Sequence, residues 1–380
     1  MKKIAILGAS GSVGMQAQSV AELRGYTVDF MSANRDTRSM EIAIRKFSPK
    51  YAAMADEAAA SELRTLVADT GTRILSGADG VIEGISLSES EVVVNSILGE
   101  AGLLPTLATI KAGKRLALAN KESLVIAGDI VMNEAAARGV EILPVDSEHS
   151  AIFQSLRCGR PSEISRIILT ASGGPFFGKT KEELKGVTLE QTLAHPTWKM
   201  GKKITVDSAT LMNKGFELIE ACHLFGVSAE KIEILIHRES ILHSAVEYVD
   251  KTIIGEMSVP DMRACVQYAV DYPERQEGVC EPLDFIRLGK MTFAAPDYEA
   301  FPLLSLAKRA AADGGAMGAV MNAADEEAVS AVLDGRLSFY RIAEVVSMTY
   351  EKLSSAKDLH SAEDILSAAS EARKTARSYI

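Results

Sequence analysis

Short apolar runs alternate with longer helical patterns through the first 150 residues of the chain. The runs span residues 4–7, 28–31, 92–98, 116–119 and 140–145. Each run has the length of a buried strand, and the intervening segments are long enough for helices. This alternation predicts an α/β domain over residues 1–150, a Rossmann-like, doubly wound parallel sheet with helices on both faces.

The pattern changes after residue 150. Strands are predicted at 166–170 and 232–236, and a hairpin from 242 to 257 turns at 249–251, so residues 151–285 form a central α+β domain. Residues 286–312 are interpreted as a connecting arm. Residues 313–380 show helical apolar periodicity interrupted at Asp334-Gly335 and Ser354-Ser355, which predicts a small C-terminal α-helical bundle.

The amino-acid composition limits which partners and which cellular compartment fit this chain. The formal charge is 41 minus 51, or −10, and a chain this acidic does not fit a nucleic-acid-binding protein. The four cysteines form no C-x-x-C pair, which is typical of reduced thiols in a cytoplasmic protein. No apolar run has the length needed to span a membrane. We therefore expect a cytoplasmic location and neither a nucleic-acid nor a membrane partner.

A turn rich in small residues follows the first strand and reads Gly8-Ala9-Ser10-Gly11-Ser12-Val13-Gly14. Small residues at this position let the backbone N–H groups approach a dinucleotide pyrophosphate at a helix N-terminus. The spacing is G-x-x-G-x-x-G, so a plain tight turn is the alternative. The next strand ends in Ser32-Ala33-Asn34-Arg35, without the acid that usually contacts the ribose of NAD. This end favours NADP.

Two carboxylates, Asp146 and Glu148, follow the apolar run that ends at residue 145. Ligands of α/β proteins bind at the carboxyl ends of such strands, and paired carboxylates suit a hard divalent cation such as Mg²⁺ or Mn²⁺. The alternative is structural: Asp146 or Ser147 caps the following helix, and Glu148 lies in its first turn. Both interpretations remain open on these residues alone.

A third carboxylate lies in the segment 207–220, which is predicted to be one helix with Asp207 or Ser208 as its N-cap. At about 100° per residue, Asn213, Lys214 and Glu217 share one arc that faces away from the apolar side. A solvated face with a Lys/Glu pair is the alternative. Gly215 costs about 1 kcal/mol in a helix interior, which indicates close approach by a ligand or backbone and favours a functional face.

The segment 172–203 begins with Ser172-Gly173-Gly174-Pro175 and contains the single tryptophan, Trp198. We interpret it as a mobile lid, since the residues around Trp198 are poor core material. A buried aromatic anchor is the alternative for Trp198. Lys121, in Asn120-Lys121-Glu122-Ser123 after the 116–119 strand, taken alone reads as an ordinary exposed lysine before a helix.

Three motifs together resemble one family. Asp146-Ser147-Glu148, His195-Pro196-x-Trp198-x-Met200-Gly201 and Ser208-Ala209-Thr210-x-Met212-Asn213-Lys214-Gly215-x-Glu217 stand in this order behind the dinucleotide turn. In this combination they resemble the 1-deoxy-D-xylulose 5-phosphate reductoisomerase family, from residue 1 to the C-terminal helices. One departure is Ala33-Asn34-Arg35, where the family typically has Gly-Lys-Asn, although Arg35 can replace the lysine charge.

The resemblance implies an NADPH-dependent oxidoreductase that isomerises and reduces 1-deoxy-D-xylulose 5-phosphate to 2-C-methyl-D-erythritol 4-phosphate, a precursor of isoprenoids, as a homodimer. It implies that Asp146, Glu148 and Glu217 hold Mg²⁺ or Mn²⁺ and, with Lys121, make up the catalytic group. The implied substrate contacts are Lys121, Ser147, Glu148, Glu217 and Trp198, with the phosphate held by Ser172, Ser208, Asn213 and Lys214 and His195 nearby. The implied cofactor contacts are Ser10, Gly11, Ser12, Val13, Ala33, Asn34, Arg35, Asn120, Lys121, Glu122, Met200, Gly201 and Met262.

Two other functions compete with this hypothesis. One is a different NADP-dependent, metal-assisted oxidoreductase acting on another phosphorylated sugar, which a comparison of substrates would distinguish. The other is a non-catalytic NADP-binding regulator. A regulator has no need of three carboxylates beside the nicotinamide, so the predicted metal site argues against it.

Overall fold

The computed structural model describes residues 2–198 and 200–380, which form two compact units. The first unit comprises the chain up to residue 123, residues 131–150 and residues 261–281. The second comprises residues 124–130, 151–260 and 282–380. Helix α6 (Glu122–Arg138) therefore contributes its ends to the first unit and its middle to the second, and its backbone leaves helical geometry at Ala127.

The first unit is built on a seven-stranded sheet in the order β4-β3-β2-β1-β5-β6-β7, with every pair of neighbours parallel. The doubly wound sheet predicted from the apolar runs is confirmed. Two strands, β3 and β4, were not predicted. The strands are β1 (Lys3–Leu7), β2 (Thr27–Ala33), β3 (Tyr51–Met54), β4 (Arg73–Ser76), β5 (Val92–Asn95), β6 (Arg115–Leu118) and β7 (Ile142–Pro144).

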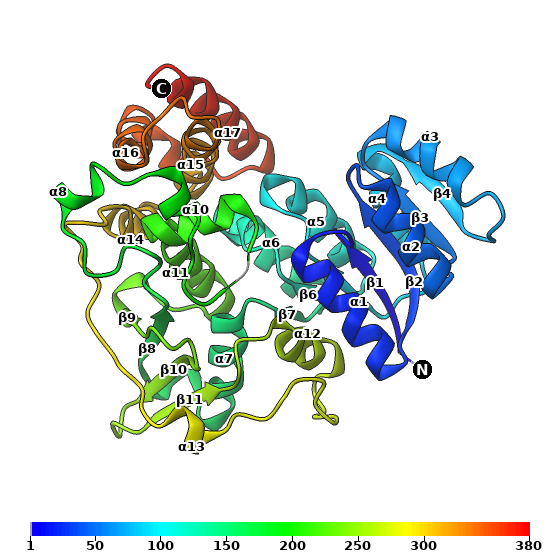
Figure 1. Cartoon of the computed structure of the whole chain (residues 1–380), viewed down its shortest axis with the longest axis horizontal. Helices are drawn as coiled ribbons and strands as arrows, with labels where there is room; N and C mark the ends of the chain where they lie inside the picture. Colours follow the sequence, from blue (N-terminus) through cyan, green and yellow to red (C-terminus); the bar gives the residue numbers. More distant parts are fainter. Residues whose placement is uncertain (1, 199) are drawn as a thin grey trace. The chain divides into compact units, whose positions relative to one another are not determined.

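Helices cover both faces of this sheet (Figure 1). Crossovers between parallel strands are right-handed, and the strand order reverses between β4 and β5. Helices α1, α2 and α3 therefore lie on one face, where α1 also packs against α12, and α4 and α5 pack together on the other. Their bounds are α1 (Ser12–Arg24), α2 (Thr37–Phe47), α3 (Glu57–Leu66), α4 (Gly77–Leu87), α5 (Leu103–Lys111) and α12 (Met262–Asp271).

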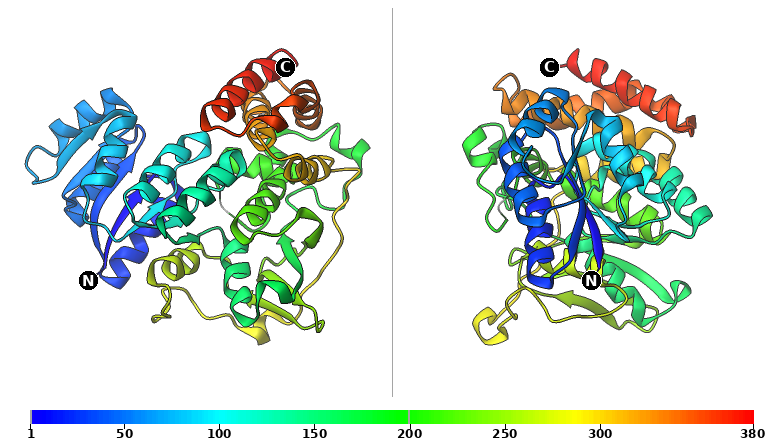
Figure 2. Two further views of the ribbon diagram at one scale, coloured as in Figure 1. Left: turned by 180° about the vertical axis from the view of Figure 1, so that it is seen from behind. Right: turned by 90° about the vertical axis from the view of Figure 1, so that its right-hand side faces the viewer.

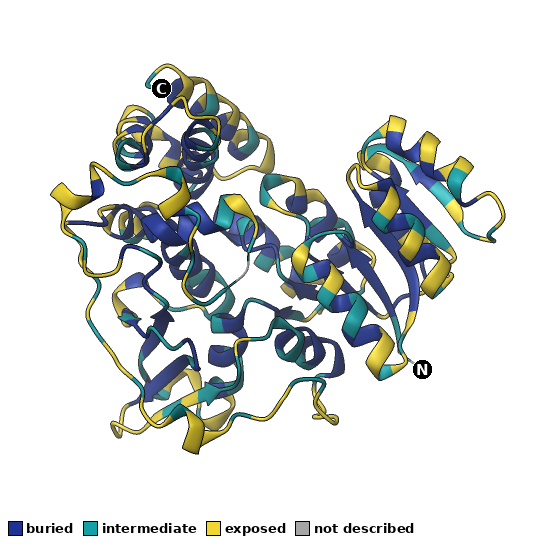
Figure 3. Cartoon of the chain, in the orientation of Figure 1, coloured by how far each residue is buried: buried dark blue, intermediate teal, exposed yellow. Residues whose placement is uncertain are grey.

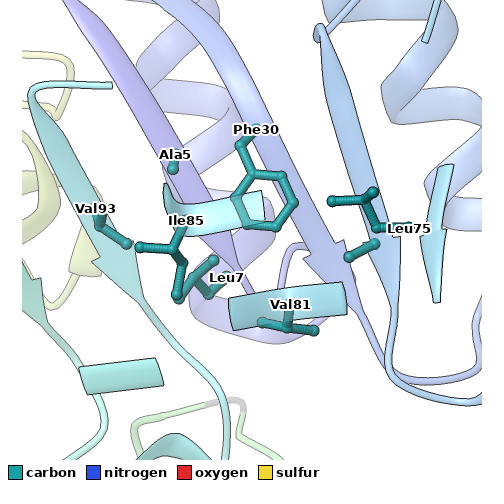
Figure 4. Close-up of a cluster of buried hydrophobic side chains, with 8 residues drawn as sticks. Ala5, Leu7, Phe30, Leu75, Val81, Ile85 and Val93 are labelled. Atoms are coloured by element: carbon teal, nitrogen blue, oxygen red, sulfur yellow. The ribbon is translucent and has the colours of Figure 1, made fainter. Parts of the chain in front are cut away.

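The core between α4 and the sheet is a buried apolar cluster (Figure 4). Val81 and Ile85 of α4 face side chains from β1, β2, β4 and β5, with Phe30 fully buried among them. A Cβ at Gly84 would lie 2.3 Å from the Phe30 ring, so a glycine is needed where α4 crosses β2. The core fixes the sheet beneath the strand ends that carry the candidate residues.

The second unit contains a four-stranded mixed sheet in the order β11-β10-β8-β9. Strands β8 (Ile164–Ala171) and β9 (Ile232–Ile236) are parallel, and β10 (Leu242–Tyr248) is antiparallel to both β8 and β11 (Ile253–Met257). The predicted strands and the hairpin are thus confirmed. Ala294, in the segment between the sheet and the C-terminal helices, exchanges two backbone hydrogen bonds with Ile236.

Helices complete the second unit, and its last helices are gathered near the C-terminus of the chain (Figure 2). Helix α15 packs against both α16 and α17, and most of its side chains are buried, in keeping with the predicted bundle (Figure 3). None of the helices over 2–198 and 200–380 has the length and apolarity needed to cross a membrane. The helices are α7 (Ser147–Ser155, which begins in the first unit), α8 (Lys181–Leu184), α9 (Leu189–Thr192), α10 (Lys202–Thr210), α11 (Met212–Phe225), α13 (Phe285–Leu288), α14 (Leu303–Asp313), α15 (Met317–Leu333), α16 (Ile342–Lys352) and α17 (Ala362–Arg377).

Candidate active site

The small-residue turn after β1 has the geometry of an anion-binding helix start. Gly8 has φ +76°, and a Cβ on it would lie 2.7 Å from the carbonyl oxygen of Ser96. A Cβ at Gly14 would lie 2.1 Å from the Gly8 oxygen, so α1 can begin beside the turn only with glycine there. Helix α1 begins at Ser12 with neither a side-chain cap nor an acidic residue in its first turn. Ser10, Ser12 and Val13 thus present N–H groups and a positive helix end to an anion, whereas the Gly11 N–H donates to the Gly8 oxygen at 2.9 Å.

The end of β2 carries no carboxylate of its own. Ala33 is the last residue of the strand, and Asn34 and Arg35 follow as exposed residues. Asp36 caps α2 by accepting a hydrogen bond from the backbone of Ser39. The Arg35 guanidinium is 79% exposed and lies 2.8 Å from a carboxylate oxygen of Asp56, the residue that caps α3. A cation is therefore available where a 2′-phosphate would need one.

Residues after β6 and β7 lie together, because these neighbouring parallel strands end at the same edge of the sheet. The Asn120 side chain is buried and donates to the carbonyl oxygens of Ile97, at 2.7 Å, and Gly99, at 2.9 Å. Its Nδ2 also donates to Glu122. The Asn120 side chain thus holds the loop after β5. The backbone of Asn120 is then the part of this residue that a cofactor can contact.

Lys121 is buried rather than exposed, and its ammonium forms an ion pair with Asp146. Asp146 directly precedes α7, and Glu148 lies in the first turn of that helix, where Ser147 Oγ donates to Glu148 Oε2 at 2.6 Å. The position at a helix start agrees with the structural alternative, and the ion pair of Asp146 agrees with the functional one. Both side chains are carboxylates, the kind of oxygen ligand that a hard divalent cation prefers.

The predicted helix over 207–220 is wrong in its boundaries. The chain forms α10 and α11, separated by Leu211 at φ +60°, so Asp207 and Ser208 lie inside α10 and cap nothing. The predicted polar arc is present on α11: Asn213 Nδ2 donates to Glu217 at 2.5 Å, and the Lys214 ammonium pairs with the same carboxylate. Lys214 is 4% exposed and Glu217 1% exposed, which contradicts the alternative of a solvated face.

Gly215 was expected to admit a ligand or backbone, and it instead admits a neighbouring helix. A Cβ at Gly215 would lie 2.7 Å from the Cβ of Ala307 on α14. Helices α11 and α14 pack closely at this point. The glycine is therefore explained by helix packing, not by a bound molecule.

Ser172 and His195 are brought together in the second unit. Their side chains are 3.0 Å apart, and His195 Nδ1 accepts hydrogen bonds from the backbone of Thr197 and Trp198. An unprotonated Nδ1 places the proton of the neutral ring on Nε2, which donates to Ser172 Oγ. Burial, together with the positive charge of Arg238, lowers the pKa of His195 to about 4. His195 is therefore neutral near pH 7.

Arg238 is the residue that the sequence interpretation missed here. It follows β9, and its guanidinium donates to the carbonyl oxygens of Ser172, at 3.2 Å, and Gly174, at 2.7 Å. A Cβ at Gly174 would lie 2.5 Å from the Ser208 oxygen, so this loop lies directly against α10. The rule that ligand residues follow parallel strands, applied to β9 as it was to β6 and β7, would have drawn attention to Arg238.

The remaining predicted residues border the 172–203 segment or begin α12. Trp198 is half-buried, and its ring lies 6.4 Å from the ring of His243, so it is not a core anchor. Met200 is half-buried, Gly201 is the exposed residue before α10, and Met262 is the half-buried first residue of α12 in the first unit. The prediction of a lid also covers Lys199, which lies outside the described residues.

A cavity of about 440 Å³ in the second unit is separate from the candidate residues. It is bordered by α8, the end of α10, the segment before α14 and the start of α16. No predicted metal, substrate or cofactor residue contributes to its wall. The candidate site therefore rests on the charged and polar groups described above and not on this cavity.

Three family models match the chain. The model described as 1-deoxy-D-xylulose 5-phosphate reductoisomerase matches residues 4–128. A second model, described as the 1-deoxy-D-xylulose 5-phosphate reductoisomerase C-terminal domain, matches residues 142–225, and a third, described as the DXP reductoisomerase C-terminal domain, matches residues 257–375. A relative of that name from Caldanaerobacter subterraneus subsp. tengcongensis is 50% identical over 357 residues, 92% of each chain. Another from Acetivibrio thermocellus is 47% identical over 346 residues, 91% of each chain.

Solved structures of the same enzyme are similar over the whole chain. A reductoisomerase from Zymomonas mobilis in complex with NADPH has a TM-score of 0.93 and 42% identity, and covers 100% of this chain and 98% of its own. A DOX-P reductoisomerase in complex with NADPH, fosmidomycin and magnesium has a TM-score of 0.94 and 37% identity, with the same coverage.

Proposed function

Because the chain belongs to the 1-deoxy-D-xylulose 5-phosphate reductoisomerase family, we propose that the polar groups described above form the active site of that reaction. The protein is an NADPH- and divalent-metal-dependent oxidoreductase and isomerase. It converts 1-deoxy-D-xylulose 5-phosphate to 2-C-methyl-D-erythritol 4-phosphate, in the supply of isoprenoid precursors. The observation that carries the assignment is 50% identity to a relative of this name over 92% of each chain.

Asp146, Glu148 and Glu217 are the proposed metal ligands. All three are carboxylates, the oxygen donors that Mg²⁺ and Mn²⁺ prefer. Asp146 is paired with Lys121, and Glu217 is paired with Lys214 and accepts a hydrogen bond from Asn213. A bound divalent ion supplies Lewis-acid stabilisation of charge on the substrate oxygens.

The substrate backbone is assigned to Lys121 and Ser147, beside the metal ligands Glu148 and Glu217. Its phosphate is assigned to Ser172, His195, Ser208, Asn213 and Lys214, a set of hydroxyl, imidazole, amide and ammonium groups that all lie in the second unit. His195 is neutral and donates from Nε2, so it serves as a hydrogen-bond donor to phosphate and not as a cation. Trp198 is assigned to cover the bound substrate.

NADPH is assigned to the first unit and to the border of the 172–203 segment. Ser10, Ser12 and Val13, with Gly11 between them, bind its pyrophosphate through backbone N–H groups, because α1 begins there uncapped. Ala33, Asn34 and Arg35 bind the 2′-phosphate end. The nicotinamide end is assigned to Asn120, Lys121, Glu122, Met200, Gly201 and Met262. The protein orients the nicotinamide against the substrate and excludes water during hydride transfer.

The domain assignment follows from these roles. Residues 1–150 form the NADPH-binding domain and also carry Asp146 and Glu148, residues 151–285 form the catalytic domain with Glu217, the phosphate-binding residues and a lid over about 172–203, residues 286–312 connect, and residues 313–380 support the others. A homodimer is proposed, supported by the apolar exposure of Phe285 and Ile286 on α13 and of Phe293. A cytoplasmic location is proposed, supported by four free cysteines.

Mixing the protein with NADPH, Mg²⁺ or Mn²⁺ and 1-deoxy-D-xylulose 5-phosphate tests the function directly. We expect loss of the reduced-nicotinamide absorbance and formation of the reduced sugar alcohol phosphate. Controls that omit metal, or that replace the substrate with another pentulose phosphate, should show little loss. Faster turnover of the other sugar phosphate would instead support the alternative oxidoreductase.

A further inference from the structure

One ion cluster, made of two buried carboxylates and a lysine whose side chain is 30% exposed, joins three helices of the second unit. The Lys203 ammonium on α10 lies 2.6 Å from Asp207 Oδ2 on the same helix and 2.9 Å from Asp325 Oδ2 on α15. It also lies 4.9 Å from the centre of the Phe216 ring on α11. Figure 1 shows these helices next to one another, and α10 packs against both of the others. A single cation therefore links α10 to its two neighbours.

The cluster is costly for the fold. Asp207 is 3% exposed and Asp325 is fully buried, so two buried carboxylates share one cation. Among the described residues, Asp207 Oδ1 and Asp325 Oδ1 have no hydrogen-bond partner, and Asp325 Oδ2 has the Lys203 ammonium as its ion-pair partner. Burial, and then the charge of Asp325, raises the pKa of Asp207. Apolar residues of similar volume would be as stable or more stable here, so stability does not explain the cluster.

The position of the cluster indicates its use. Lys203 ends the 172–203 segment, and Asp207 directly precedes Ser208, which is assigned to the substrate phosphate. Helix α11, whose Phe216 faces the ammonium, carries Lys214 and Glu217. The other end of the segment is also held by the C-terminal helices, because the rings of Phe176 and Phe339 are 5.0 Å apart and edge-to-face. Both ends of the segment are thus fixed to residues beyond 313.

We propose that Lys203 is a positioning residue that, through Asp325, holds the end of the 172–203 segment and Ser208 in the arrangement that binds the sugar phosphate. The proposal rests on the proposed function for its kinetic readout. It assigns to α15 a role in substrate binding through the ion pair of Asp325 with Lys203. Lys203 would act through its own helix, α10, which carries Ser208, and through the 172–203 segment, which contains Trp198.

Asp325→Asn is the primary test because stability and positioning predict opposite results. The amide keeps the shape and removes one poorly compensated buried charge, so the melting temperature should be unchanged or higher. The substitution nonetheless weakens the interaction of Lys203 on α10 with position 325 on α15. We expect the KM for 1-deoxy-D-xylulose 5-phosphate to rise about tenfold, with the NADPH Kd unchanged, since a small misplacement is enough for such losses.

Lys203 variants and an independent readout complete the experiment. Lys203→Met should lower kcat/KM about a hundredfold and Lys203→Arg should recover most of it. Arg373→Met is the matched control, because it removes another ion pair of α15, at 2.5 Å to Glu326, without touching α10. Acrylamide quenching of Trp198, the single tryptophan, should increase in Asp325→Asn and Lys203→Met and stay unchanged in Arg373→Met.

The outcomes separate this proposal from the proposed function. A wild-type protein that fails to turn over the substrate contradicts the proposed function. The quenching of Trp198 still tests, in that case, whether Lys203 and Asp325 hold the 172–203 segment. Should Asp325→Asn keep the wild-type KM and wild-type quenching, the positioning role is overturned. The same conclusion follows if Arg373→Met raises KM and quenching as much as Asp325→Asn does.

Discussion

At the scale of single residues, burial decides between two interpretations of the same side chains. A Lys/Glu pair three residues apart on a helix is ordinarily a solvated pair worth a few tenths of a kcal/mol. Lys214 and Glu217 are both nearly inaccessible, and desolvating such a pair costs more than its attraction returns unless other groups assist. Asn213 supplies one such group. The burial of this pair thus contradicts a solvated face and supports the proposed role of Lys214 and Glu217 in ligand binding.

Arg35 gives a prediction about cofactor choice. Its exposed ion pair with Asp56 is worth at most about 1 kcal/mol, so the guanidinium can turn to a 2′-phosphate at little cost. A charged hydrogen bond to that phosphate contributes roughly 1.5–3 kcal/mol, or about ten- to a hundredfold in affinity. We expect Arg35→Ala to raise the NADPH Kd by this factor and to leave the NADH Kd unchanged, as measured by fluorescence titration.

Arg45→Ala is the matched control for Arg35→Ala. Arg45 is another ion-paired arginine of the first unit, on α2, and contacts Glu41 and Asp69. Its removal should change neither Kd. Equal affinities of the wild-type protein for NADPH and NADH would contradict the role of Arg35.

His195 gives a prediction about pH. Its pKa is about 4 in the folded protein and about 6.5 in an unfolded chain, so the unfolded state binds more protons between these values. The stability that comes from its neutral, hydrogen-bonded form is complete above about pH 6.5 and is lost as the pH falls toward 4. We expect the free energy of unfolding to fall between pH 7 and pH 5 by about 1 kcal/mol more in wild type than in His195→Gln, after allowance for solvent screening.

Urea unfolding at both pH values measures this difference. Burial also lowers the pKa of His223, and its contribution cancels because both proteins retain it. His360→Gln removes an exposed histidine and should behave as wild type. An identical pH dependence in His195→Gln and wild type would show that the His195 environment differs from the one described.

At the scale of elements, the sequence predicts strands that carry β-branched and long aliphatic residues. Five of the seven strands of the first unit were predicted, and each of the five contains such a run. The two missed strands are short, and β3 reads Tyr-Ala-Ala-Met, a composition that suits a helix equally well. Strand β3 is held in the sheet by pairing with β2, and β4 by pairing with β3, and no local pattern reveals either pairing.

The break between α10 and α11 was missed for a different reason. Leu211 adopts φ +60°, a region that branched side chains avoid and that sequence rules reserve for glycine, asparagine or aspartate. Leu211 is 3% exposed, so its burial offsets the backbone cost. Tertiary packing thus changes the element, and it moves Asp207 and Ser208 from an expected cap to the inside of α10. The predicted polar arc is nevertheless present on α11, because residues 213–217 lie after the break.

Gly215 gives a prediction at the level of helix packing. An alanine at position 215 would gain about 1 kcal/mol of helix propensity. Its methyl group would, however, lie 2.7 Å from the methyl group of Ala307, and overpacking of this kind typically costs about 1–3 kcal/mol. We expect Gly215→Ala to destabilise the protein by roughly 1 kcal/mol. The cost should vanish or change sign in the Ala307→Gly background, since that change removes the opposing methyl group.

A double-mutant cycle by thermal or urea unfolding tests the contact between α11 and α14. An equal cost of Gly215→Ala with and without Ala307 would mean that the two residues do not meet. If Gly215 instead faces a ligand, Gly215→Ala would weaken substrate binding at unchanged stability.

At the scale of the whole molecule, the proposed metal ligands come from both units. Asp146 and Glu148 follow β7 in the first, and Glu217 lies on α11 in the second. The local pattern of carboxylates at a strand end and on one helical arc left a structural alternative open, and the family resemblance was needed to propose these residues as ligands. The contacts of Lys203 with Asp325, and of Arg238 with the carbonyl oxygens of Ser172 and Gly174, had no local pattern, since each joins residues that are distant in sequence and lie on separate elements.

The last prediction tests whether Glu148 and Glu217 bind one metal ion. If Glu148 and Glu217 bind the same ion, Mn²⁺ at a hundredfold excess over its Kd should stabilise the wild-type protein by about 2.7 kcal/mol. Glu148→Gln and Glu217→Gln should each lose most of that stabilisation and most of the turnover, while NADPH binding remains. The double variant should be little worse than either single variant, because residues that act on one ion are not additive. Glu134→Gln, on the exposed part of α6 and paired with Arg138, is the control and should keep the full effect of Mn²⁺. If Glu148 only supports the start of α7 and Glu217 only partners Lys214, both variants would respond to Mn²⁺ as wild type does, and the double variant would show the sum of two independent stability costs. Thermal unfolding with and without Mn²⁺, measured on these four variants beside wild type, distinguishes a shared metal site from two local structural roles.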